Sequence, residues 1–255
     1  MTTWVLLRGL TREARHWGDF GERLDSGLGG ATVLAVDLPG NGAFHAAPSP
    51  TDVAGMVRAC RASLAQIGAQ PPFVPVALSL GGMVALEACC RHPAEFTGAV
   101  LINTSMRGYG ALWQRLRPAN WGTLARLALR SACVSERELA VLAMTSRDPE
   151  THRAGLARWE AIAAERPVTR LNALRQLVAA ARYAPPRHGP RVPMLLLASE
   201  GDRLVSPQCS QRFARRWDLP LRLHPWAGHD LPLDDPAWVV EQIAGWRFAV
   251  SPETI

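Results

Sequence analysis

The stretch Val76-Ala77-Leu78-Ser79-Leu80-Gly81-Gly82 decides the fold of this 255-residue chain. An apolar run ends in a small-x-Ser-x-Gly pattern and passes at once into a helical pattern. Small residues around the serine permit a sharp, strained turn that lifts the hydroxyl above the edge of a sheet. The next N–H groups and the positive end of the helix can then stabilise an oxyanion. A serine that merely caps a helix would give a similar pattern, so the motif needs partners elsewhere in the chain.

Short apolar runs alternate with longer helical patterns along the chain. The expected strands lie at 4–7, 32–36, 73–78, 99–102 and 194–198, with a weaker sixth at 221–224. The expected helices lie near 51–68, 80–92, 207–217 and 235–249. Such apolar strands are typical of a parallel sheet that helices cover on both faces. Because Pro75 lacks an N–H group, we expect its strand to be irregular or to pair fully only from Val76.

Residues 107–184 interrupt this alternation with helical patterns and no clear strand. Pro185-Pro186 closes the segment, as expected for a linker. The sequence therefore predicts a core of residues 1–106 and 185–255 with a helical cap at 107–184. The cap holds 13 arginines against 6 acidic residues. We interpret them as solvated helix faces, with an acidic partner such as an acyl carrier protein as the alternative.

Composition excludes several classes of protein. The net charge is +6, and all 28 basic residues are arginine, spread along the chain rather than clustered with aromatics as in nucleic-acid binders. No apolar run reaches the length of a membrane span, and we see no secretory signal. Five cysteines without zinc spacing favour reduced thiols in a cytoplasmic protein, with no metal. The tryptophans Trp113, Trp121 and Trp159 are expected to pack the cap or line an acyl pocket.

A nucleophilic serine needs a base, and the base needs an acid that orients it. His229 lies in a glycine-flanked loop after the last expected strand, and Asp202 follows a glycine after the fifth. The chain order Ser79, Asp202, His229 is that of one hydrolase architecture. Glu200 is the rival for the acid, and Asp202 could instead cap the next helix.

An oxyanion hole needs two donors. The N–H groups of Leu10, after Gly9 at the end of the first expected strand, and of Leu80 are the candidates. An ordinary turn after a strand is the alternative for the first of them.

These residues resemble the α/β-hydrolase superfamily over nearly the whole chain. Ser79 matches its nucleophile elbow, Asp202 its acid site and His229 its base site. Residues 37–42 resemble its D-x-P-G-x-G loop, and Trp17 matches an aromatic residue often found after its oxyanion loop. Among its members the chain looks most like small bacterial carboxylesterases, including the pimeloyl-carrier-protein methyl ester esterase type. The resemblance implies an α/β-hydrolase fold with a trimmed sheet of about six strands.

The resemblance implies a cofactor-free serine esterase that acts on a small-molecule or carrier-linked ester. Other triad reactions remain open, namely thioester hydrolysis, C–C bond hydrolysis and perhydrolysis, as does a non-catalytic ligand-binding protein on the same fold. One departure stands out, because Arg8-Gly9 replaces the family's usual His-Gly. We expect Arg8, Gly9 and Trp17 to contact substrate, with Arg8 favouring an anionic substrate or leaving group.

Overall fold

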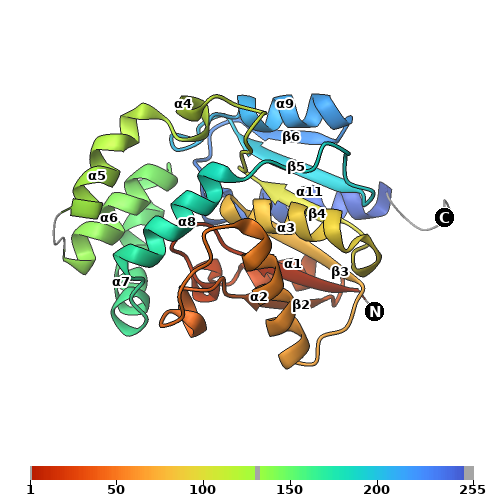
Figure 1. Ribbon diagram of the computed structural model, residues 1–255, viewed down its shortest axis with the longest axis horizontal. Helices are drawn as coiled ribbons and strands as arrows, with labels where there is room; N and C mark the ends of the chain where they lie inside the picture. Colours follow the sequence, from red (N-terminus) through yellow and green to blue (C-terminus); the bar gives the residue numbers. More distant parts are fainter. Residues whose placement is uncertain (1, 130–132, 250–255) are drawn as a thin grey trace.

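The structure, a computed structural model, describes residues 2–129 and 133–249. Six strands form one sheet in the order β2-β1-β3-β4-β5-β6 (Figure 1). They are β1 (Thr3–Leu7), β2 (Thr32–Val36), β3 (Phe73–Leu78), β4 (Ala99–Ile102), β5 (Met194–Ser199) and β6 (Leu221–His224). Every neighbouring pair is parallel. The predicted fold class, a mostly parallel sheet of about six strands flanked by helices, is confirmed.

Helices cover both faces of this sheet. Figure 1 shows α2 (Val53–Gln66) and α3 (Leu80–Arg91) in front, with α1 (Phe20–Gly27) and α11 (Pro236–Ala249) behind. The side chains of β1 alternate between the two faces, as the pleat requires. Val5 and Leu7 join the core under α2, α3 and α9 (Gln208–Trp217), whereas Trp4 and Leu6 join the core under α1 and α11.

Pro75 lies inside β3, a central strand of the sheet. It is in register with Val5 of β1, so β3 pairs with that neighbour along its whole length up to Ala77. Pairing with β4 begins only at Val76. The proline therefore delays pairing on one side of the strand without ending the strand.

The chain between β4 and β5 is helical wherever the structure describes it. It forms α4 (Leu112–Arg115), α5 (Trp121–Leu129), α6 (Val134–Thr145), α7 (Pro149–Glu165) and α8 (Arg170–Arg182). Figure 1 shows α5, α6 and α7 grouped beside the sheet, with α8 running from them back toward the core. We keep the name cap for residues 107–184, whose status as a separate unit stays a prediction. The short elements are η1 (Ala14–Trp17), η2 (Gly42–Phe44), η3 (Pro93–Glu95), η4 (Pro118–Asn120) and α10 (Leu231–Asp234).

Two buried amides attach α8 to the loops that follow β1 and β2. The Asn172 side chain accepts from Ser49 N at 2.9 Å. Gln176 accepts from Thr11 N at 2.8 Å and donates to Asn41 Oδ1 at 2.8 Å. Because buried polar groups are costly when unpaired, these bonds hold the cap in one position above the core.

Candidate active site

Ser79 lies at the turn between β3 and α3. Its backbone has φ 56° and ψ −115°, a strained conformation for a residue with a side chain. Its N–H group donates to Ile102 O at 2.9 Å, which ties the turn to the end of β4. The side chain makes no capping hydrogen bond to α3. The helix-cap interpretation therefore does not account for the hydroxyl group.

His229 and Asp202 meet in the loops after β6 and β5. His229 Nδ1 lies 2.7 Å from Asp202 Oδ2, and the two side chains are 5% and 1% exposed. Asp202 Oδ1 accepts from Leu204 N at 2.7 Å and from Val205 N at 2.9 Å. Since a carboxylate can only accept, His229 Nδ1 donates and the ring is held in one tautomer. The rival Glu200 is exposed, and the structure pairs His229 with Asp202 instead.

Gly201 lets these two loops approach each other. A Cβ atom at this position would lie 2.0 Å from Trp226 O, inside the loop that carries His229. Any side chain at residue 201 would push the two loops apart. The close packing of these two loops thus requires glycine at residue 201, in addition to its place in the turn before Asp202.

The structure joins Asp202 to His229 but does not join His229 to Ser79 by a hydrogen bond within the described residues. Catalytic hydrogen bonds are often long without substrate and tighten when it binds. The Ser79–His229 step therefore stays a prediction.

The loop after β1 lies directly against Ser79. A Cβ atom on Gly9 would lie 3.1 Å from Ser79 Cβ and 3.7 Å from its Oγ. This close approach brings the backbone that leads to Leu10 beside the hydroxyl group. Leu80 is the first residue of α3, so its N–H group lies at the positive end of that helix. The pairing of the Leu10 and Leu80 N–H groups as an oxyanion hole stays a prediction.

Arg8 is buried beside this loop rather than open to solvent. Its Nη1 and Nη2 atoms lie 3.0 and 2.5 Å from the two carboxylate oxygens of Asp230, and both side chains are 3% exposed. The guanidinium carbon lies 4.9 Å from the centre of the Trp17 ring. Trp17 is itself buried and stacks on Phe20. The expected contacts of Arg8 and Trp17 with substrate stay predictions.

The loop that carries His229 has further anchors that sequence reasoning missed. Asn103, at the end of β4, donates to Gly228 O at 3.1 Å and His229 O at 2.9 Å. The N–H group of Asp230 donates to Thr145 O, at the end of α6, at 2.7 Å. Asn103 directly follows an apolar strand, and this position was the available signal. The partner of Asp230 had no signal in the sequence.

A second buried network connects the loop after β1 to the cap. Arg12 forms an ion pair with Glu138 of α6 and lies over the Trp159 ring of α7, 4.6 Å from its centre. Its Nη1 atom also lies 3.0 Å from His16 Nε2. Burial, followed by the charges of Arg12 and Arg8, strongly lowers the pKa of His16. Trp159 is thus buried against the loop after β1, whereas Trp113 and Trp121 are 62% and 45% exposed.

Asp37 binds two loops near the site. Its carboxylate accepts from Ala14 N at 2.6 Å and from Ala43 N at 2.9 Å. Burial raises the pKa of Asp37. This explains the aspartate of the D-x-P-G-x-G stretch as a structural link between the loops after β1 and β2.

Comparison with known proteins now identifies the family. Residues 4–242 match the sequence model of the alpha/beta hydrolase family. The chain belongs to this family. A comparison with curated proteins gives no match.

Solved structures of other alpha/beta hydrolases share the fold. An esterase from Thermogutta terrifontis is 18% identical with a TM-score of 0.74, over 98% of this chain and 90% of that one. An esterase from Exiguobacterium antarcticum is 14% identical with a TM-score of 0.75, over 96% and 91%. BpoC from Mycobacterium tuberculosis, a candidate non-heme bromoperoxidase, is 19% identical with a TM-score of 0.73, over 98% and 93%. Identities this low show the fold alone. No helix in residues 2–129 or 133–249 of this hydrolase is long and apolar enough to cross a membrane.

Proposed function

We propose that this hydrolase cleaves carboxylic esters through Ser79, His229 and Asp202. The observation that carries the proposal is the buried 2.7 Å contact between His229 and Asp202, which leaves His229 Nε2 as the nitrogen for a nucleophile. Ser79 supplies the matching strained turn and a hydroxyl group that does not cap its helix.

The proposed reaction passes through an acyl-enzyme. His229 Nε2 takes the Ser79 proton as Oγ attacks the ester carbonyl carbon. The N–H groups of Leu10 and Leu80 bind the resulting oxyanion, while Asp202 stabilises the imidazolium. The C–O bond to the alcohol then breaks, and the alcohol leaves with the proton from His229. Water attacks the acyl-enzyme by the same steps, which releases the acid and restores Ser79.

The Gly9–Ser79 contact supports the oxyanion donors. An oxyanion hole works when its donors are fixed before the reaction, because they then need no reorganisation as charge develops. Gly9 touches the nucleophile, and the first turn of α3 follows the nucleophile directly. Both donors therefore belong to segments that pack on Ser79.

Labelling with a fluorophosphonate tests the proposal. We expect the reagent to modify Ser79 in the wild-type protein, as mass spectrometry of the peptide would show. Ser79→Ala should fold, resist labelling and lose several orders of magnitude in kcat. A folded wild-type protein that does not label would contradict the proposal. A substrate panel of esters, thioesters and vinylogous diketones then separates ester hydrolysis from the other triad reactions.

A further inference from the structure

We propose that Arg8 and Asp230 form a positioning pair that fixes the loop carrying His229 relative to the loop carrying Leu10. This inference rests on the proposed function. Arg8 lies two residues before Leu10, and Asp230 directly follows His229. The ion pair thus joins the flanks of the predicted oxyanion donor and of the predicted base. Neither side chain has a place in the chemical steps themselves.

The geometry of the pair suits a rigid link. Two parallel N–H···O contacts, of 3.0 and 2.5 Å, fix the orientation of the two planar groups as well as their distance. Both side chains are 3% exposed, so water competes little for either charge. Trp17 lies against the Arg8 guanidinium, at 4.9 Å, and limits its rotation.

The sheet cannot supply this link by itself. The loop with Leu10 follows β1, and the loop with His229 follows β6. In the order β2-β1-β3-β4-β5-β6, three strands separate β1 from β6. The Arg8–Asp230 pair spans that separation directly, so the two loops do not depend on the accumulated twist and flexibility of four strand pairings.

The other anchors of the His229 loop hold it in different directions. Asn103 attaches it to the end of β4, and the Thr145 carbonyl attaches it to α6. Asp202 orients the imidazole ring. None of these three groups belongs to the loop after β1. The distance between base and oxyanion donor is therefore the quantity that the Arg8–Asp230 pair controls.

The pairing also argues against a simple anion site at Arg8. Asp230 supplies one negative charge in bidentate contact with the guanidinium, so the pair carries no net charge. A substrate anion would have to displace a buried carboxylate to bind there. A neutral ester and an anionic ester should consequently respond alike to changes in the pair.

Two variants at Asp230 test the role. Asp230→Asn removes the charge with little change of shape. Asp230→Glu lengthens the side chain by one methylene but keeps the carboxylate. Arg8 then retains a charge partner, so this variant is less prone to unfold than Asp230→Asn. We expect kcat for a neutral p-nitrophenyl ester to fall about 10- to 100-fold in Asp230→Asn and about tenfold in Asp230→Glu. KM should change less than twofold, and a succinate half-ester should show the same losses.

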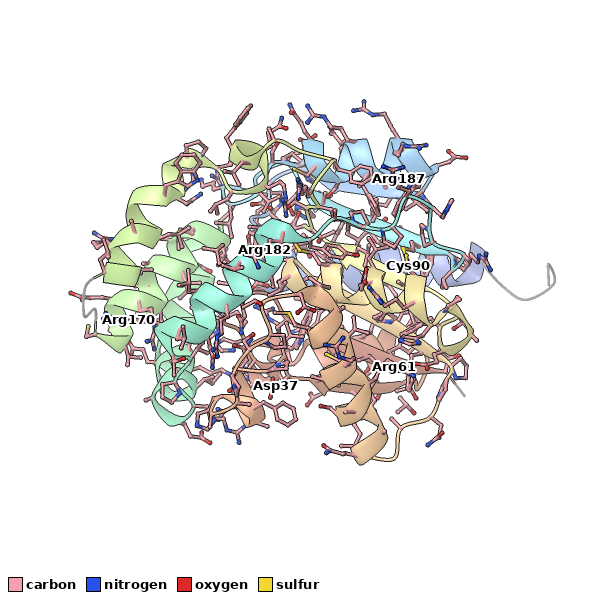
Figure 2. The ribbon with its side chains drawn as sticks, in the orientation of Figure 1. Asp37, Arg61, Cys90, Arg170, Arg182 and Arg187 are labelled. Atoms are coloured by element: carbon pink, nitrogen blue, oxygen red, sulfur yellow. The ribbon has the colours of Figure 1, made fainter. Side chains whose placement is uncertain are left out.

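Glu95→Gln is the matched control. Glu95 forms a bidentate pair with Arg61 of α2, and this pair is 25% and 40% exposed. Figure 2 shows Arg61 on the side of the molecule away from α5, α6 and α7. Loss of this ion pair should leave kcat unchanged. Thermal unfolding of all variants identifies a temperature at which each is fully folded for the kinetics.

A spectroscopic measurement separates this inference from the proposed function. The His229 Nδ1 proton, hydrogen bonded to Asp202, should give a low-field proton resonance that His229→Gln removes. We expect Asp230→Asn and Asp230→Glu to shift or broaden it, even in a protein that does not turn over esters. A wild-type protein that hydrolyses no ester and does not label at Ser79 would refute the proposed function alone.

The positioning role would be overturned by wild-type kcat in either folded Asp230 variant. Losses confined to the anionic ester and expressed in KM would also overturn it, in favour of anion binding. If the wild-type protein hydrolyses no ester, an unchanged His229 resonance in Asp230→Glu would likewise overturn the positioning role.

Discussion

Two buried histidines lie five residues apart near the end of β6, and each faces an aspartate. His229 Nδ1 lies 2.7 Å from Asp202, and His224 Nε2 lies 3.1 Å from Asp235. Counted over the whole residue, they are 4% and 2% exposed. Burial and a carboxylate partner therefore do not separate the proposed base from a structural histidine.

The second ring nitrogen separates them. A neutral imidazole has one donor and one acceptor nitrogen. His224 Nδ1 accepts from Ala227 N at 2.9 Å, so both nitrogens of that ring are used in holding the turn. Within the described residues, no protein group forms a hydrogen bond with His229 Nε2. General-base catalysis requires a free acceptor nitrogen, and the contact of this nitrogen with Ser79 stays a prediction.

A third buried histidine follows the pattern of His224. Arg12 can only donate, so His16 Nε2 must accept from it at 3.0 Å. The other ring nitrogen, Nδ1, contacts the backbone of Glu13 and lies 3.1 Å from its N and 3.3 Å from its O. Both nitrogens are again used within the protein. His16 and His224 are thus the natural controls for His229.

The largest expected effect comes from replacing each of the two histidines near the end of β6 by glutamine. His229→Gln should lower kcat by at least about 10⁴-fold, because the nucleophile loses its base. His224→Gln should leave fluorophosphonate labelling of Ser79 intact while lowering the stability of the fold. Labelling rates and thermal unfolding of both variants check this pair of outcomes. If folded His229→Gln and folded His224→Gln lost labelling equally, the free Nε2 atom would not distinguish His229 from His224.

The sequence predicted the framework of the molecule closely. The expected strands at 32–36, 73–78, 99–102 and 221–224 have the bounds of β2, β3, β4 and β6, because short apolar runs between breakers mark strands. The central strands β3 and β4 are buried throughout, whereas the edge strands β2 and β6 are only partly buried. The residues that the structure brings together at Asp202 and His229 were found by their position after strands. Position along the chain fixes the edge of a parallel sheet at which a residue emerges.

The partners of Arg8, Arg12 and His16 could not be predicted in the same way. Arg8 and Asp230 are 222 residues apart, and Arg12 and Glu138 are 126 apart. No helical or strand periodicity relates residues so far apart, and the sequence does not distinguish a buried arginine from an exposed one. Arg8 was expected to contact substrate because it replaces the histidine of the family's His-Gly, and the structure places only its neighbour Gly9 against Ser79. The structure shows that adjacent residues of this loop face different surroundings.

The next largest effect is on stability, and it concerns the ion pair between Arg12 and Glu138 beside His16. Glu138→Gln should lower the free energy of unfolding by about 3–5 kcal/mol, because Arg12 is left buried without its charge partner. The control is Glu165→Gln, which breaks an ion pair with Arg15 at a side chain that is 57% exposed. That change should cost at most about 1 kcal/mol. Urea unfolding at pH 7 measures both, and similar small losses would show that the Arg12–Glu138 pair adds little to the cap's attachment.

The smallest effect is a dependence of stability on pH that His16 should produce. Burial and the charges of Arg12 and Arg8 lower the pKa of His16 in the folded chain, whereas the unfolded chain keeps the ordinary value of 6.5. The unfolded chain therefore binds the extra proton first, so this contribution to stability is present above about pH 6.5 and is lost as the pH falls. The loss should approach about 1.4 kcal/mol for each pH unit well below 6.5.

His16→Gln isolates that contribution. Glutamine keeps an acceptor for Arg12 but does not titrate, so the variant should show a shallower decline of unfolding free energy between pH 7 and pH 5. Urea unfolding at pH 8, above the window, supplies the baseline difference between the two proteins. Parallel curves for the variant and the wild type would contradict this prediction, because they would mean that the folded chain protonates His16 as readily as the unfolded chain does.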